Sequence, residues 1–120
     1  MRIWKERNEE FEGGTMPRTT ILSANRAAFV HVPPVYWEFV GDVGYGEFVG
    51  LRFYEGVTAL ADLGLSEAPA TFAAFADDMA GTYYGFLDGG ADVCALDSHG
   101  WICDPLGQDL EAFLAELLEE

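Results

Sequence analysis

Basic residues are scarce in this chain of 120 residues. Six lysines and arginines stand against 21 aspartates and glutamates, which gives a formal net charge of −15. From residue 27 onward, Arg52 is the only lysine or arginine and 17 residues are acidic, a balance of −16. Such a surface repels nucleic acid and anionic lipid and attracts a basic partner. An excess of acidic residues also increases solubility or reflects adaptation to a salty habitat, and the sequence leaves these explanations open.

Long hydrophobic runs are also missing. No stretch approaches the roughly 18 apolar residues of a membrane-spanning helix, and the first ten residues lack the apolar segment of a secretory signal. Half of the residues are nevertheless hydrophobic, which favours a folded chain, and the length suits one domain. We therefore expect a cytoplasmic, single-domain protein.

The first residues are polar and are followed by Gly13-Gly14, a helix-breaking pair. This pattern predicts that residues 1–15 are a flexible or loosely attached extension and that residues 16–120 form the domain. The alternative is an ordinary N-terminal helix that packs through Trp4.

Catalytic signatures are absent as well. The chain contains no nucleophile elbow, metalloprotease motif, phosphate loop or dinucleotide fingerprint, so we expect no enzyme activity and no cofactor. A hairpin turn at residues 97–100 would place Cys94 opposite Cys103. A disulfide or a shared metal is then geometrically possible, and a small metal-dependent enzyme remains a minor alternative. Two reduced, buried thiols are the commoner arrangement in a cytoplasmic protein.

One helix is predicted to begin at Pro34 and to end before Gly44. Its apolar residues recur at helical spacing: Tyr36, Phe39, Val40 and Val43. Trp37 and Glu38 lie off this stripe, which predicts that both are exposed.

A C-terminal helix is predicted to begin after the N-cap Asp109, with an apolar stripe of its own. The other predicted elements are a short helix after Ser23, strands at 51–54, 71–76, 82–87, 93–96 and 101–104, and a brief helix over 57–63. The sum is an α+β fold with N-terminal helices, a central and mostly antiparallel sheet, and a C-terminal helix packed on that sheet.

Three segments follow one another in an order that resembles a known family. The first is Pro33-Pro34 with Tyr36, Phe39-Val40 and the turn Gly44-Tyr-Gly46; the second is Phe75-Ala-Asp-Asp78 with Gly81 and Tyr84; the third is Asp109-Leu-Glu-Ala-Phe113-Leu114. Together they span residues 33–118 and resemble the Smi/Knr type of the SUKH superfamily. The order and spacing of the segments carry the likeness, because each motif alone is weak.

That resemblance implies a protein-binding role without catalysis. Bacterial members of the family look like immunity proteins that neutralise a cognate toxin domain, often a nuclease, and fungal members look like regulators of the cell wall. A basic toxin domain is the expected partner, and an intracellular regulatory or scaffold protein is the alternative. The candidate contact residues, chosen for predicted exposure with Trp37 as an anchor, are Trp37, Glu38, Glu47, Asp77, Asp78, Asp88 and Asp92.

Overall fold

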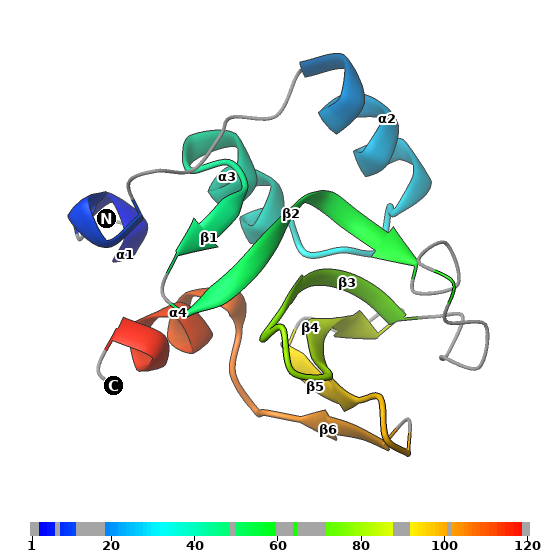
Figure 1. Ribbon diagram of the computed structural model, residues 1–120. Coiled ribbons are helices and arrows are strands. Elements are labelled where there is room, and N and C mark those ends of the chain that lie inside the picture. The colour runs from blue at the N-terminus through cyan, green and yellow to red at the C-terminus, as the bar shows by residue number, and fades with distance from the viewer. Residues whose placement is uncertain are drawn as a thin grey trace.

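One antiparallel sheet organises the molecule, with its strands in chain order from one edge to the other (Figure 1). The computed structural model describes residues 3–6, 8–11, 19–48, 50–59, 64, 72–87, 92–100 and 102–118. The strands are β1 (Gly46–Phe48), β2 (Leu51–Ala59), β3 (Phe72–Asp77), β4 (Thr82–Leu87), β5 (Cys94–Asp97) and β6 (Ile102–Pro105). With the helices, they confirm the predicted α+β class.

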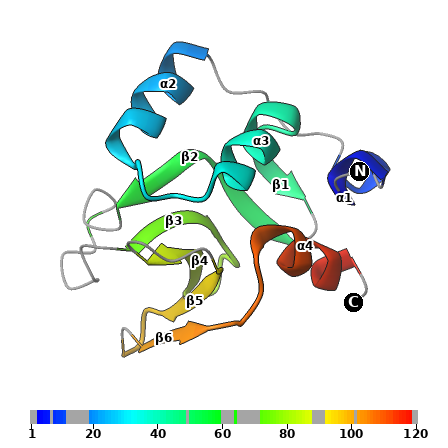
Figure 2. The same cartoon turned by 180° about the vertical axis from the view of Figure 1, so that it is seen from behind.

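The helices are α1 (Ile3–Glu6), the 3-10 turn η1 (Asn8–Phe11), α2 (Thr19–Ala28), α3 (Pro34–Asp42) and α4 (Leu110–Leu118). Contacts join α1 to α4, α3 to α4, and α2 to β2 (Figures 1 and 2). None of the described helices is long and apolar enough to cross a membrane.

An aromatic core lies between one face of the sheet and the helices. Tyr36 and Phe39 of α3 are each 1% exposed, as the predicted stripe requires. Phe75 at the centre of β3 is fully buried, and its ring centroid lies 5.3 Å from that of Phe86 and 6.0 Å from that of Phe113 on α4. The predicted cap of α4 is confirmed, because Ala112 N donates to Asp109 Oδ1 at 2.9 Å.

The opposite face of the sheet has a smaller apolar cluster of its own. Phe72, Ala74, Cys94 and Leu96 are buried there, with Tyr54, Tyr83, Leu87 and Cys103 packed against them. A bulge between Ala74 and Ala76 lets Phe75 and Ala76 both face the main core. Strand β3 is therefore buried along its whole length.

Residues 3–6 and 8–11 pack on the domain, although residues 1–15 were predicted to be a flexible or loosely attached extension. Trp4 and Phe11 are 2% and 4% exposed and belong to the main core. Trp4 Nε1 donates to Asp42 Oδ2 at 3.1 Å, and Ile3 N donates to Glu111 Oε2 at 3.1 Å. The alternative, packing through Trp4, describes these residues. The proposed boundary at residues 15 and 16 lies outside the described residues.

Two further predictions are wrong. Residues 57–59 continue β2 instead of opening a helix; residues 60–63 lie outside the described part. Helix α2 begins at Thr19, four residues before the predicted cap Ser23.

Candidate functional site

The predicted acidic contact residues come from separate parts of the fold. Glu38 on α3, Glu47 on the edge strand β1 and Asp92 before β5 are exposed. Asp78 is half-buried in the β3–β4 turn, and Asp88 lies outside the described residues. Among the described residues, Glu47 and the Asp77-Asp78 turn lie near each other across β2, whereas Glu38 and Asp92 lie on other elements.

Asp77 does not have the exposure predicted for it. Its side chain is 4% exposed and its carboxylate Oδ2 accepts hydrogen bonds from Arg52 Nη2 at 2.6 Å and from the Tyr54 hydroxyl at 2.5 Å. Asp77 Oδ1 accepts from Met79 N at 2.8 Å. The carboxylate thus holds two strands and a turn together, which makes Asp77 a structural residue.

These contacts explain two pKa shifts. Burial alone would raise the pKa of Asp77, but the hydrogen bonds from Tyr54, Arg52 and the Met79 amide outweigh it and hold that pKa below its ordinary value. Burial, together with the hydrogen bond to Asp77, raises the pKa of Tyr54 well above its ordinary value. Asp77 is consequently anionic and Tyr54 neutral near pH 7.

The Asp77-Asp78 pair forms the turn between β3 and β4, because aspartates favour turns by bonding to nearby amides. Asp78 Oδ1 accepts from Ala80 N at 2.8 Å and from Thr82 N at 3.0 Å. Met79 has a positive φ of 62° and its side chain is 53% exposed. Both carboxylates are thus engaged in holding this turn.

Arg52 is ion-paired to Asp77 and therefore does not offset other acidic residues. It lies opposite Glu47 on β1 and opposite Asp77 on β3, so that the three side chains form a row on one face of the sheet. Arg52 is the only lysine or arginine after residue 26, so its pairing with Asp77 leaves residues 27–120 with no further lysine or arginine of their own to offset the other acidic residues.

The sequence predicted that Cys94 and Cys103 lie directly opposite each other, and this prediction is wrong. The hairpin pairs Leu96 with Cys103 and Cys94 with Pro105, so the thiols are diagonal neighbours on one face. Both are free, and burial, followed by the nearby Cys94, raises the pKa of Cys103 to about 11. Within the described ranges, no group of three or more His, Cys, Asp or Glu side chains could hold a metal ion.

Trp37 is buried, which is another correction to the predicted contact residues. It is 6% exposed and its ring centroid lies 5.1 Å from that of Tyr36. It borders a groove of about 310 Å³ between α2 and α3, lined by Leu22, Ser23, Arg26, Pro34, Trp37 and Glu38. Glu38 is thus beside Trp37 as predicted, but Arg26 brings a positive charge to the same groove.

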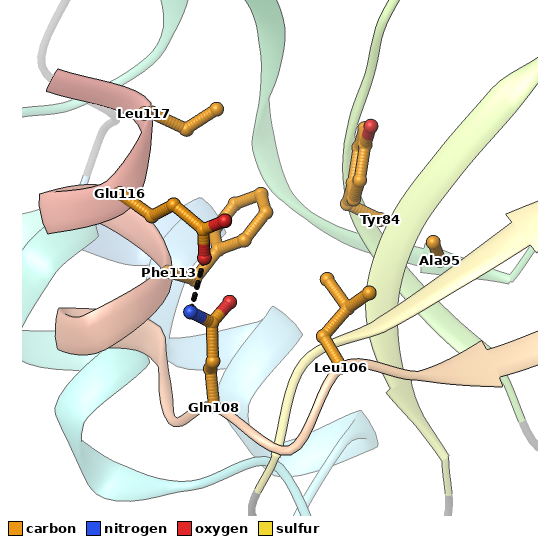
Figure 3. Close-up of a pocket in the computed structure, with 7 residues that line it drawn as sticks. All are labelled: Tyr84, Ala95, Leu106, Gln108, Phe113, Glu116 and Leu117. Carbon is orange, nitrogen blue, oxygen red and sulfur yellow. Dashed lines mark hydrogen bonds between the residues drawn. The ribbon is translucent and has the colours of Figure 1, made fainter. Parts of the chain in front are cut away.

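A second groove was missed by the sequence reasoning. It has a volume of about 330 Å³ and lies between α4 and the sheet (Figure 3). Its lining residues are Tyr84, Ala95, Leu106, Gln108, Phe113, Glu116 and Leu117. In the sequence, Tyr84 and Phe113 belong to two separate segments, and only the tertiary fold brings them beside Glu116.

No protein-family model matches the chain, and comparison with curated proteins and with solved structures gives no match either. The resemblance to the SUKH superfamily therefore rests on the three sequence segments.

Proposed function

We propose that this chain is a non-catalytic immunity protein of the Smi/Knr-like SUKH type, which binds and neutralises a cognate basic toxin domain. The observation that carries the proposal is the charge of residues 27–120, which is −16 with the one basic side chain, Arg52, ion-paired to Asp77. A net acidic surface of this size attracts a cationic protein and accelerates the encounter.

A nuclease is the partner class that such a surface suits best. A nuclease groove is basic because it binds phosphates, and exposed carboxylates can occupy the same positions. Acidic side chains exposed on several elements supply the negative charge: Glu38, Glu47, Asp92, Asp97, Asp104, Asp109 and Glu116. The resemblance to immunity proteins supports the same role.

Capture of a defined partner tests this proposal. The immobilised chain is offered a catalytically inactive, cationic nuclease toxin domain encoded beside its gene, and an acidic domain of similar size as the control. We expect saturable binding of the cationic domain at 20 mM NaCl, inhibition of the active nuclease by the chain, and release as salt is raised. Absence of binding at low salt, or binding without inhibition, contradicts the proposal.

Three conservative variants show whether the surface charge acts as proposed. Glu38→Gln, Glu47→Gln and Asp92→Asn each remove one exposed charge, and the triple variant removes three. We expect the triple variant to associate more slowly with the toxin domain, and its association rate to depend less on salt. Exposed charges around an interface act mainly on the association rate. An unchanged rate would remove these residues from the interface.

A further inference from the structure

The groove beside α4 has an apolar floor with an aromatic wall. Phe113 is 4% exposed, and the Tyr84 ring centroid lies 5.2 Å from its own at an interplanar angle of 41°. Leu106 and Leu117 complete the apolar lining (Figure 3). A volume of about 330 Å³ is at the small end for ligand pockets, and suits one long side chain better than a cofactor.

The charged groups at this groove are acidic. Glu116 is exposed on α4, and Gln108 donates a hydrogen bond to its Oε2 (Figure 3). Asp104 on β6 is paired with Ala95, a lining residue, so its side chain projects from the same face of the sheet. The groove therefore combines one lining carboxylate, that of Glu116, with an aromatic ring and apolar walls, and Asp104 adds a second acid on the same face of the sheet.

None of the described lysines and arginines neutralises these carboxylates. Arg52 pairs with Asp77 on the opposite face of the sheet, and Lys5 pairs with Asp42 at 3.5 Å. Arg26 lines the separate groove between α2 and α3. The described part of the chain thus leaves the acidic groove open to a cation from another molecule.

We propose that this groove receives an arginine side chain of the basic protein partner. The aliphatic stem would lie on Leu106 and Leu117, and the guanidinium would stack on Tyr84 and pair with Glu116. Arginine is favoured over lysine because its planar, weakly hydrated head stacks on aromatic rings and donates in a fork to a carboxylate. The inference rests on the proposed function for its partner, but the chemistry of the groove is testable separately.

An NMR titration with a minimal probe tests the groove. The ¹⁵N-labelled chain is titrated with N-acetylarginine amide, and in parallel with N-acetylcitrulline amide, which has nearly the same shape without the charge. We expect saturable shifts of the amides of Tyr84, Ala95 and Gln108 with the arginine compound only. Equal shifts with the citrulline compound, or shifts only elsewhere, overturn the proposal.

Two charge-matched variants make the test specific. Glu116→Gln, an exposed change that spares the core, should weaken binding of the arginine probe about three- to fivefold, the size expected for one exposed ion pair. Glu9→Gln removes the same charge from an exposed position of η1, which does not line the groove, and should leave the affinity unchanged. Equal affinities of the Glu116→Gln variant and the unaltered chain would overturn the assignment.

Capture of the cationic toxin domain by the unaltered chain and by Glu116→Gln distinguishes the two proposals. If Glu116→Gln weakens its capture as well, the groove is part of the interface. If the domain is captured equally by the unaltered chain and by Glu116→Gln, the groove assignment fails and the proposed function stands. If the arginine probe binds in the groove but no basic domain is captured, the proposed function and the partner named here fail, while the recognition chemistry stands.

Discussion

Gly85 of β4 lies where the backbone of β3 approaches most closely. A Cβ added at this position would lie 2.2 Å from the Ala73 carbonyl oxygen and 2.8 Å from Ala74 Cα, distances that require a strand to move. We therefore expect Gly85→Ala to lower the free energy of unfolding by roughly 2–3 kcal/mol, as overpacked cores do. Urea denaturation followed by circular dichroism measures the change.

Gly41 of α3 provides the matched control, since a Cβ added there meets no atom within 4 Å. Alanine is a better helix former than glycine, so Gly41→Ala should raise the free energy of unfolding by about 0.5–1 kcal/mol. Destabilisation of similar size in both variants would contradict the close approach at Gly85.

Asp77 makes a pH-dependent contribution whose sign follows from its lowered pKa. A carboxylate with a pKa lower in the folded than in the unfolded chain stabilises the fold above its unfolded pKa, and this contribution is lost as pH falls below about 4. At pH 7, Asp77→Asn should cost roughly 2 kcal/mol, because hydrogen bonds to a charged group are lost.

The difference between the unaltered chain and Asp77→Asn should shrink toward pH 2.5, as measured by urea denaturation at both pH values. Using this difference cancels the effect of the other carboxylates, whose mutual repulsion also changes with pH. Asp92→Asn, at an exposed site, serves as the control and should cost less than about 0.5 kcal/mol. A difference for Asp77 that is constant with pH would contradict the lowered pKa.

Exposure of single residues was the least predictable property. A turn at Asp77-Asp78 follows from local chemistry, since aspartates favour turns by bonding to nearby amides. That Asp77 is buried depends on Arg52 and Tyr54, which are more than 20 residues away. Trp37 lies off the apolar stripe of α3 but is covered on another side of the helix. Helical periodicity identifies one buried face of a helix but does not predict whether a second face is also covered.

Helix α2 is attached to the sheet through one side-chain amide. Asn25 Nδ2 donates to the Val57 carbonyl at 2.8 Å, and Val57 N donates to Asn25 Oδ1 at 2.9 Å. The amide thus pairs with β2 where the register of β2 and β3 is interrupted. Asn25→Ala should cost roughly 1–3 kcal/mol, because two buried backbone groups lose their partner.

Hydrogen exchange of individual backbone amides tests whether Asn25 attaches α2 to the sheet. We expect the Val57 amide and the amides of α2 to exchange faster in Asn25→Ala, while those of β4 change only with the global stability. Ser23→Ala is the control on the same helix: Ser23 is exposed and follows the start of α2 by four residues, so it should have little effect. Unchanged protection at Val57 would contradict the role of Asn25.

Elements with strong local signals were predicted well. Strand β4 matches its predicted range of 82–87, and α3 and α4 have their expected apolar stripes. The β5–β6 hairpin was predicted with its turn at residues 97–100, whereas Asp97 pairs with Ile102 and the turn lies one residue later. That shift made Cys94 and Cys103 diagonal neighbours. Strand alternation does not distinguish such registers, because both keep the cysteines on one face.

At the scale of the whole molecule, composition predicted the charge and the fold class but not the grooves. Net charge is a property of the sequence, and so is the concentration of basic residues in the first 26 positions. The groove with Glu116 requires α4 to pack beside β4 and β5, which are far from it in the sequence. Candidate contacts chosen from the sequence therefore come from several elements, and the groove with Glu116 was missed.

The concentration of charge predicts opposite effects of salt on the free chain and on its complex. Repulsion among the charges of a chain with net charge −15 destabilises the compact state. NaCl should therefore raise the melting temperature, by about 5 °C for each kcal/mol by which it raises the free energy of unfolding. Most of this rise should be complete by 0.5 M, since the screening length falls from about 10 Å at 0.1 M to about 3 Å at 1 M.

Over the same range of salt, affinity for the cationic toxin domain should fall, because screening weakens attraction between the partners as it weakens repulsion within the chain. Thermal denaturation and binding measured in identical buffers compare the two trends. A melting temperature that keeps rising between 1 and 3 M, with binding unaffected by salt, would assign the acidity to a salty habitat. Opposite trends that both level off below 1 M would assign it to recognition of a basic partner.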